Sequence, residues 1–352
     1  MVFFDWASTS PVVKYPCSNY GPFMNVNANY AYKEKRLLKE CEDRVKKVIG
    51  AKGGKVIFGG TSSQLIENLF NAMQTNYYAC NIICSAYEHE SFFRYQDDSV
   101  KTLAALKSSL QLESNDRAPF VLWQGVNNIT GEIFSAKQIG EFVHKYNGFY
   151  ICDGTAQIGH TPIEPNIDDW CDFYVFSGHK IGTELGIGCC WVSDRLDKWL
   201  NDFKLHGTPN LAGALAITQA VEDACDTKTI EKNNFHWGEL ASKFSDLLYK
   251  NNIKHIFVPL VLDDYTCAIN AIRLPGFNAD ALQQYLASKQ IYVSIGGSAC
   301  AEKHDYRVLN DYGLSNDEAS EVIRVSFGED SSVEDVEALV EGIKNFKELY
   351  LK

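Results

Sequence analysis

The sequence predicts an α/β fold, with a mostly parallel sheet in a large domain and a smaller α+β domain after it. Two observations support this prediction. Short apolar runs alternate with amphipathic segments up to Val192, a pattern typical of strands that are covered by helices on both faces. Beyond Val192 helical patterns dominate, and strands return only near residue 256. At roughly 150 residues per domain, the 352-residue chain holds about two domains, which we expect at 15–240 and at 1–14 with 241–352.

The large domain begins with a helix. An apolar stripe through Leu37, Cys41 and Val45 predicts a helix over 34–49, and Gly50 is its stop signal. A strand at 55–58 then leads through a Gly-Gly-Thr-Ser-Ser loop into a second amphipathic helix. The other expected elements are strands at 81–84, 119–124, 149–152, 172–176 and 187–192, and a helix at 135–146.

The smaller domain mixes strands and helices. Its expected strands lie near 256–258, 267–274, 291–294 and 322–327, with a helix at about 279–289. Ser332 and Asp335 form a capping-box pattern, which predicts that the last helix begins there and runs to the C-terminus.

Composition narrows the possible partners. The chain carries 45 acidic and 33 basic residues, a net charge of −12, and an acidic surface repels phosphate backbones and anionic lipid. We therefore expect no nucleic acid or membrane as main partner. The N-terminus resembles no signal peptide, and the 11 cysteines include no CxxC pair. Both features favour a cytoplasmic protein with reduced thiols. Cys300 and His304 lack a second pair of metal ligands nearby, so no metal site is predicted.

Three segments suggest shared chemistry at the carboxyl ends of the predicted strands. Asp153 ends one strand, and Ser177, His179 and Lys180 follow another. A lysine at a buried sheet edge has its charged form disfavoured, which suits covalent attachment to an aldehyde. An aspartate nearby suits the ring nitrogen of pyridoxal 5'-phosphate. The loop before the second helix offers backbone N–H groups and hydroxyls, including Ser62 and Ser63, for a phosphate.

Each segment also has an ordinary structural interpretation. Ser-Gly-His-Lys alone is most often a surface turn, an aspartate at a strand end is often a helix cap, and Gly-Thr-Ser-Ser is often an N-cap. Their occurrence together, in order and each after a strand, favours the cofactor site.

Longer motifs resemble the class V aminotransferase family of fold-type I pyridoxal-phosphate enzymes, and within it the cysteine desulfurases. The matching segments span nearly the whole chain: Phe4–Pro11, Glu88-His89, Val126–Gly131, Ser177–Lys180, Gly207–Asn210, Gly296–Ala301 and Ile323–Gly328. The resemblance implies a seven-stranded, mostly parallel sheet in the large domain. One position departs from the pattern, because Ala156 stands where the family usually has Gln, and Gln157 follows it.

The resemblance also implies roles for individual residues. His89 is expected to stack on the cofactor ring and to take part in catalysis with Lys180. Asn128 is expected near the cofactor's phenolic oxygen and the substrate. Arg324 is expected to bind the substrate carboxylate. The remaining residues are expected on the cofactor phosphate: Ser62, Ser63, Ser177, His179 and, from a partner subunit, Thr208.

The loop before Cys300 resembles the loop that carries the nucleophilic cysteine of desulfurases. The implied activity converts L-cysteine to L-alanine, forms a persulfide on Cys300 and passes the sulfur to an acceptor protein. A homodimer is implied, because Thr208 would act across subunits. Two alternatives remain open: an aminotransferase or cysteine/selenocysteine lyase in which Cys300 is not the nucleophile, and a non-catalytic scaffold that keeps the fold.

Overall fold

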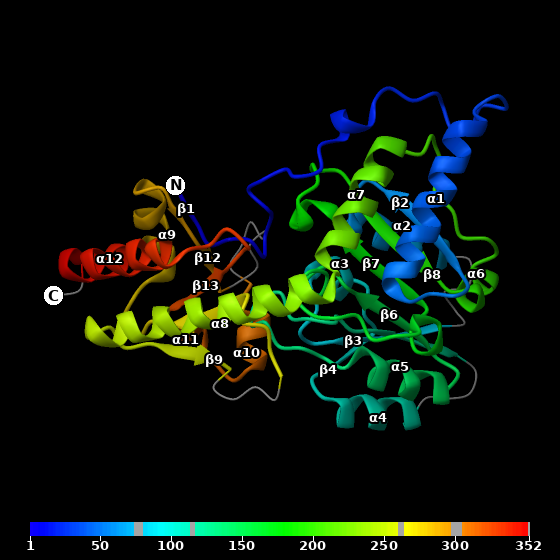
Figure 1. Ribbon diagram of the computed structural model, residues 1–352. Helices are drawn as coiled ribbons and strands as arrows, with labels where there is room; N and C mark the ends of the chain where they lie inside the picture. Colours follow the sequence, from blue (N-terminus) through cyan, green and yellow to red (C-terminus); the bar gives the residue numbers. More distant parts are fainter. Residues whose placement is uncertain (74–79, 113–116, 260–263, 297–304, 351–352) are drawn as a thin grey trace. The chain divides into compact units, whose positions relative to one another are not determined.

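The computed structural model describes residues 1–73, 80–112, 117–259, 264–296 and 305–350 (Figure 1). The chain forms two compact units. The seven-stranded unit consists of residues 12–125 and 134–230. The four-stranded unit consists of residues 1–11, 126–133 and 231–352.

The seven-stranded unit is built on one sheet with the strand order β2-β8-β7-β6-β5-β3-β4. Its strands are β2 (Lys55–Gly59), β3 (Cys80–Ser85), β4 (Asp98–Val100), β5 (Ala118–Leu122), β6 (Phe149–Asp153), β7 (Phe173–Ser177) and β8 (Gly188–Val192). The five strands β3 to β7 pair in parallel, whereas β8 is antiparallel to both β7 and β2. Because β2 is antiparallel to β8, it runs in the same direction as β7. The sheet is therefore mostly parallel, as predicted.

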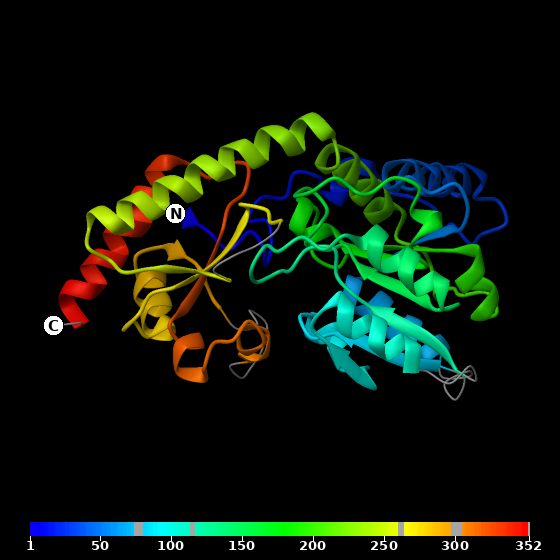
Figure 2. The ribbon, with the colours of Figure 1, turned by 90° about the horizontal axis from the view of Figure 1, so that it is seen from below.

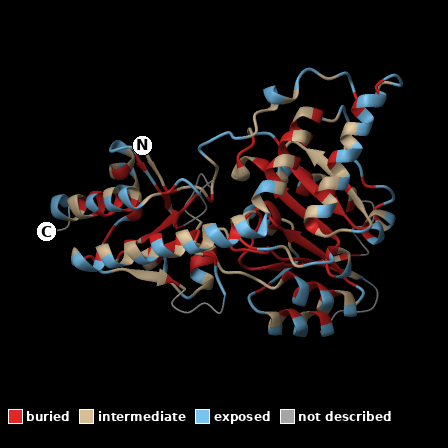
Figure 3. Ribbon diagram, in the orientation of Figure 1, coloured by how far each residue is buried: buried red, intermediate tan, exposed pale blue. Residues whose placement is uncertain are grey.

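Helices cover both faces of this sheet, and alternate strand residues point to opposite faces. On β6, Tyr150 and Cys152 join one buried cluster, while Phe149 and Ile151 join the other. The first cluster includes buried side chains of α1 (Tyr32–Ile49), α4 (Leu103–Leu112), α5 (Ala136–Lys145) and α7 (Leu211–Ala224). The second includes those of α2 (Ser62–Met73), α3 (Glu90–Phe93) and α6 (Asp194–Trp199). The strands are accordingly buried and the helices half exposed (Figure 3). Two-sided burial explains the continuous apolar runs in the sequence.

Local sequence signals lie where helices begin and end. Gly50 follows α1 in the left-handed conformation, with φ of 70°, and its N–H bonds back to the last turn. Ser332 and Asp335 form the predicted capping interaction at the start of α12 (Val333–Tyr350), because each accepts from the other's backbone N–H. The short elements β4, α3 and α4 were not predicted, since their segments are too short or too weakly amphipathic to show a period.

The four-stranded unit contains the antiparallel sheet β12-β13-β10-β9 and a small parallel pair, β1-β11. Its strands are β1 (Val2–Phe3), β9 (Ile256–Val258), β10 (Ile269–Arg273), β11 (Ile291–Tyr292), β12 (Ser294–Ile295) and β13 (Val322–Ser326). Its helices are most of α8 (Thr227–Lys250), α9 (Ala279–Ser288), α10 (Arg307–Asp311), α11 (Asn316–Ala319) and α12. Helix α12, red in Figure 2, packs against α9. Of the helices in the described ranges, none is long and apolar enough to cross a membrane.

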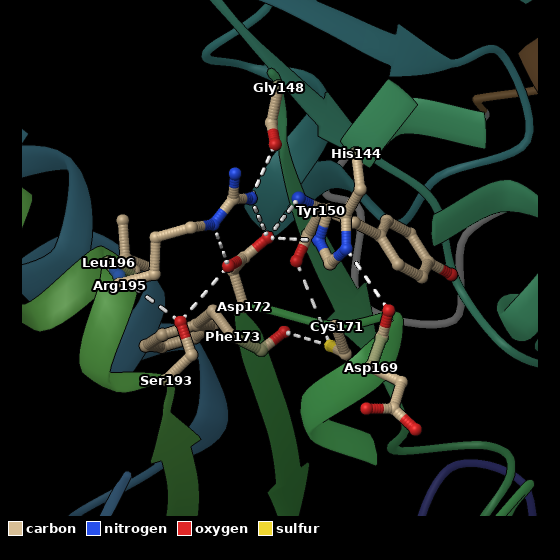
Figure 4. Close-up of polar contacts among 10 residues, drawn as sticks. All are labelled: His144, Gly148, Tyr150, Asp169, Cys171, Asp172, Phe173, Ser193, Arg195 and Leu196. Carbon is tan, nitrogen blue, oxygen red and sulfur yellow. Dashed lines mark hydrogen bonds and ion pairs between the residues drawn. The ribbon is translucent and has the colours of Figure 1, made fainter. Parts of the chain in front are cut away.

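A buried carboxylate fastens the amino end of β7 (Figure 4). Asp172 accepts hydrogen bonds from His144 Nε2 at 2.8 Å, from Arg195 Nη2 at 2.7 Å and from Ser193 Oγ at 3.0 Å. It also accepts from the backbone N–H of Tyr150 on β6 at 3.0 Å. Burial would raise the pKa of Asp172, but the hydrogen bonds from His144 and Arg195 outweigh it and hold the pKa below its ordinary value.

Candidate active site

The predicted site residues of the seven-stranded unit follow strands that end at one edge of the sheet. Asp153 is the last residue of β6 and pairs in register with Val175 of β7. Two residues further along β7, Ser177 ends the strand, and Lys180 lies in the single helical turn that follows it, Gly178–Ile181. His89 follows β3, which runs in the same direction. Carboxyl ends of parallel strands are where open α/β sheets bind ligands.

The carboxylate of Asp153 is buried and oriented by its own chain. Its Oδ1 accepts a hydrogen bond from the backbone N–H of Thr155 at 2.8 Å. Gly154 lies between them, and a Cβ there would come within 2.2 Å of the Tyr174 ring. The turn after β6 therefore requires a glycine. This arrangement fits a carboxylate that has to face the ring nitrogen of a cofactor.

Two neutral imidazoles lie within electrostatic reach of Lys180. Burial, and to a smaller extent the positive charge of Lys180, lower the pKa of His179 to about 4. The pKa of His160 is also lowered, mainly by burial and to a smaller extent by the charge of Lys180. Its hydrogen bond with the Ala156 carbonyl oxygen acts in the opposite direction but is outweighed. At pH 7 both rings are therefore uncharged. Sequence reasoning missed His160, since a single histidine after a strand gives no signal.

A close approach between strand and helix builds the expected phosphate cradle. Gly188 of β8 pairs with both Gly59 of β2 and Ser177 of β7. A Cβ on Gly188 would lie 2.6 Å from the carbonyl carbon of Thr61 and 2.8 Å from the nitrogen of Ser62. The absence of a side chain at Gly188 therefore lets the start of α2 lie beside Ser177.

The first turn of α2 supplies donors for an anion. Ser62 and Ser63 open this 12-residue helix, and first-turn N–H groups have no acceptor within their own helix. The preceding Thr61 hydroxyl accepts from the Gln64 N–H at 3.0 Å, which fixes the entry to the helix. A phosphate fits such a helix N-terminus.

His89 and Thr208 have different surroundings. His89 caps α3, and its Nδ1 accepts from the backbone N–H of Ser91 at 3.2 Å, so the ring is held in one orientation. Thr208 is exposed in the segment before α7, whose N-cap is Asn210. Gln157, next to Ala156, accepts from the Tyr174 hydroxyl at 2.9 Å and is committed to this buried contact.

The four-stranded unit holds Arg324, which is only 1% exposed. It lies on β13, directly opposite Ser294 of β12. The N-terminal segment runs beside β13, with Asp5 paired to Ser326, and this places the Asp5 carboxylate on the guanidinium. Arg324 Nη2 donates to Asp5 Oδ1 at 2.7 Å.

The loop that carries Asn128 is tied to the same guanidinium. Arg324 Nη1 donates to the backbone oxygen of Asn128 at 2.9 Å. The neighbouring Asn127 shapes the loop, because its Oδ1 accepts from the N–H groups of Ile129 at 2.8 Å and Thr130 at 3.1 Å. The structure thus brings Asn128 and Arg324 together. Cys300 lies outside the described residues.

Fold and site define a class of protein. A seven-stranded, mostly parallel sheet carries a buried aspartate, a lysine after the neighbouring strand and a helix N-terminus shaped by Gly188, and this donor set fits pyridoxal phosphate. The protein is a fold-type I pyridoxal-phosphate enzyme. The Aminotransferase class-V family matches residues 2–339, and the chain belongs to that family.

Known proteins support this assignment. The chain is 24% identical over 388 residues to cysteine desulfurase IscS 1 of Archaeoglobus fulgidus, covering 97% of this chain and 95% of that protein. It is 24% identical over 374 residues to cysteine desulfurase IscS of a Shewanella strain, with 97% and 91% covered. The solved structure of a NifS-like protein from Rickettsia africae matches with a TM-score of 0.82 at 21% identity, covering 99% of both chains. The structural match confirms the predicted fold.

Proposed function

We propose that the protein is a cysteine desulfurase, which converts L-cysteine to L-alanine and delivers the sulfur to an acceptor protein. The observation that carries the proposal is the placement of Asp153, Lys180 and the start of α2 at one edge of one sheet. The names of the relatives support the choice of substrate.

Different residues of the chain have different proposed roles in the reaction. When bound, pyridoxal phosphate serves as the electron sink for bonds at the substrate Cα. The Asp153 carboxylate holds a proton on the cofactor's ring nitrogen, and the Lys180 Nζ takes the proton from the substrate Cα. Neutral His179, Ser177 and the first N–H groups of α2 hold the phosphate without adding a second cation beside Lys180. Arg324 binds the substrate carboxylate, as a guanidinium suits.

Cys300 is the proposed sulfur acceptor within the enzyme. Its thiolate forms a bond with the substrate sulfur while the substrate's carbon–sulfur bond breaks. The electron pair of that bond stays with the substrate carbon, which gains a proton and leaves as alanine. The product on the chain is a persulfide, and the acceptor protein removes its outer sulfur.

A cytoplasmic homodimer is the proposed form of the enzyme. Within the seven-stranded unit, large apolar side chains are exposed near the N-terminal segment and after Lys180: Val12, Val13, Met24, Tyr30, Tyr32 and Leu185 are each more than 40% exposed. Thr208 is exposed in the same unit. These features support a second copy of the chain as the partner, with Thr208 reaching its phosphate site.

Incubation with L-cysteine tests the activity. We expect equal amounts of sulfide and alanine when a thiol reductant is present. Cys300→Ala should abolish both, whereas the control Cys267→Ala, a half-buried cysteine of the same unit, should retain them. Alanine formation that does not depend on Cys300 would contradict the persulfide step.

Reduction with borohydride tests the lysine. Peptide mapping of the reduced holoenzyme should find the pyridoxyl group on Lys180. An adduct on another residue, or no adduct in protein saturated with cofactor, would contradict the proposed link between Lys180 and the cofactor.

A further inference from the structure

Arg324 is already occupied by groups of its own chain. Nη2 donates to Asp5 Oδ1 at 2.7 Å, to Ser8 Oγ at 2.5 Å and to Ser294 Oγ at 3.1 Å. Both serine hydroxyls in turn donate to Asp5 Oδ1, each at 2.7 Å. Asp5 Oδ1 is therefore the centre of the network, and it receives three donors.

The Nε donor of the Arg324 guanidinium is buried and has no acceptor in the part of the chain that the structure describes. A buried N–H without an acceptor is costly, and Nε with the adjacent Nη2 forms the side of a guanidinium that binds a carboxylate with two parallel hydrogen bonds. This unpartnered donor points to the place where a carboxylate binds.

Hydrogen counting shows what such a ligand displaces. Nη2 carries two hydrogens, yet three oxygens lie within reach of it. A carboxylate that accepts from Nε and from one hydrogen of Nη2 leaves the second Nη2 hydrogen for Asp5 or one of the two serines. The neutral serine oxygens give way more readily than the charged Asp5, because the ionic hydrogen bond is the stronger one.

We propose that Asp5 sets the affinity of Arg324 for the substrate carboxylate, holding the guanidinium in place and offsetting its charge. This inference rests on the proposed role of Arg324 in binding substrate. The Asp5–Arg324 pair is neutral before the ligand arrives, so the incoming carboxylate meets no net positive charge and experiences repulsion from Asp5. Asp5 is a positioning residue whose charge keeps binding of amino acids weak and release of the product alanine easy.

Propionate is a suitable probe, because it has a carboxylate but no amine that could react with the cofactor. In the holoenzyme, Asp5→Asn keeps an oxygen acceptor at the same place and removes the charge. We expect propionate to bind at least about tenfold more tightly, because like charges about 4 Å apart repel by about 1 kcal/mol even in bulk water and by more near a protein surface. Titration calorimetry gives the dissociation constant, and KM for L-cysteine should fall while kcat does not rise.

A second ion pair of the same unit provides the matched control. Arg273 donates to Glu321 Oε2 at 2.7 Å and to Glu318 Oε1 at 2.5 Å. Glu321→Gln neutralises a partner of this other arginine and should leave the dissociation constant of propionate unchanged. Propionate binding that is unchanged or weaker in Asp5→Asn would overturn the proposal.

If Asp5→Asn does not fold, a second variant tests the premise that Arg324 binds the carboxylate, without which the proposal fails. The double variant Asp5→Asn/Arg324→Met replaces the buried pair with neutral side chains and should lose propionate binding altogether. Retained binding would show that Arg324 is not the carboxylate site. Since propionate binding requires no turnover, the result is independent of whether the protein releases sulfide from cysteine.

Discussion

At the residue scale, the positive charge of Lys180 lowers the pKa of His179 and of His160. Burial, the larger cause, and the charge of Lys180 together lower the pKa of His179 to about 4. The pKa of His179 is therefore lower in the folded protein than in the unfolded chain. As pH falls, the unfolded chain takes up the proton first. The neutral ring thus contributes stability that is full at neutral pH and declines from about pH 6.5 toward pH 4.

This interpretation predicts the outcome of one substitution. In the cofactor-free protein, Lys180→Met should raise the pKa of His179, but not to its ordinary value, because burial is the larger cause. Histidine titration by NMR measures the change. The control Lys55→Met, which removes a lysine paired with Asp197 and Asp202, should leave His179 unaffected. Equal shifts in both variants would contradict the assigned cause.

The sequence alone yielded charged and polar candidates for the site, but not the residues that support them in the structure. Asp153 and Lys180 were predicted because their motifs, ambiguous one by one, together fit a single kind of cofactor site, and Arg324 was predicted because its segment resembles that of the family. Thr155, His160 and Asp5 were not assigned a role, because a backbone donor, a neighbouring ring and a resident counter-charge become visible only when the chain is folded. The roles assigned to Asp153, Lys180 and Arg324, and to His89, Asn128 and Cys300, stay predictions.

At the element scale, the contact between β8 and α2 shapes the segment that we propose to bind the phosphate. Gly188→Ala would place a Cβ 2.6 Å from the Thr61 carbonyl carbon, so the start of α2 must shift away from Ser177. We expect cofactor affinity to fall at least about tenfold, because a cost of about 1.4 kcal/mol already gives that factor. Titration of the cofactor's absorbance measures this loss.

Its control is a glycine at which an added Cβ would meet no close contact. Gly238 lies within α8, and a Cβ there would have its nearest neighbour at 3.9 Å, the Cys267 sulfur. Gly238→Ala should leave cofactor affinity unchanged and stabilise the helix slightly. Similar affinities for the two variants would show that the close approach at Gly188 does not matter for the cofactor.

The opposite end of β7 is fastened by Asp172. Asp172→Asn leaves Arg195 and His144 facing a neutral group, and we expect the free energy of unfolding at pH 7 to drop by about 3 kcal/mol, as for a broken buried ion pair. Denaturant unfolding measures this drop. Because the folded pKa of Asp172 is lowered, its contribution is present above the ordinary pKa and is lost as pH falls through the lowered one, so the two proteins should converge in acid.

An exposed aspartate is the control for this effect. Asp202 pairs with Lys55 and Lys204 at the surface and has a positive φ of 68°, which asparagine tolerates. Asp202→Asn should change stability little. A difference between wild type and Asp172→Asn that persists unchanged at low pH would argue against the carboxylate as its source.

At the scale of the whole molecule, the order and type of long elements could be predicted from periodicity. Strands at 256–258 and 149–152, and helices at 34–49 and 279–289, agree with the structure within two residues at each end. Periodicity could not predict the strand order or the membership of residues 126–133 in the four-stranded unit, because both depend on contacts between distant segments. The boundaries at 14/15 and 240/241 stay a prediction about independent folding units.

The proposed dimer makes the last prediction, since it requires a complete site to take residues from two chains. If Thr208 acts on the partner's cofactor, a Lys180→Ala chain paired with a Thr208→Ala chain forms one site that lacks both residues and one that lacks neither. Mixed dimers, refolded together and separated by affinity tags, should regain about half of the wild-type activity, whereas each variant alone is impaired. If Thr208 acted within its own chain, each site of the mixed dimer would lack one residue, and no activity beyond the average of the two variants would return.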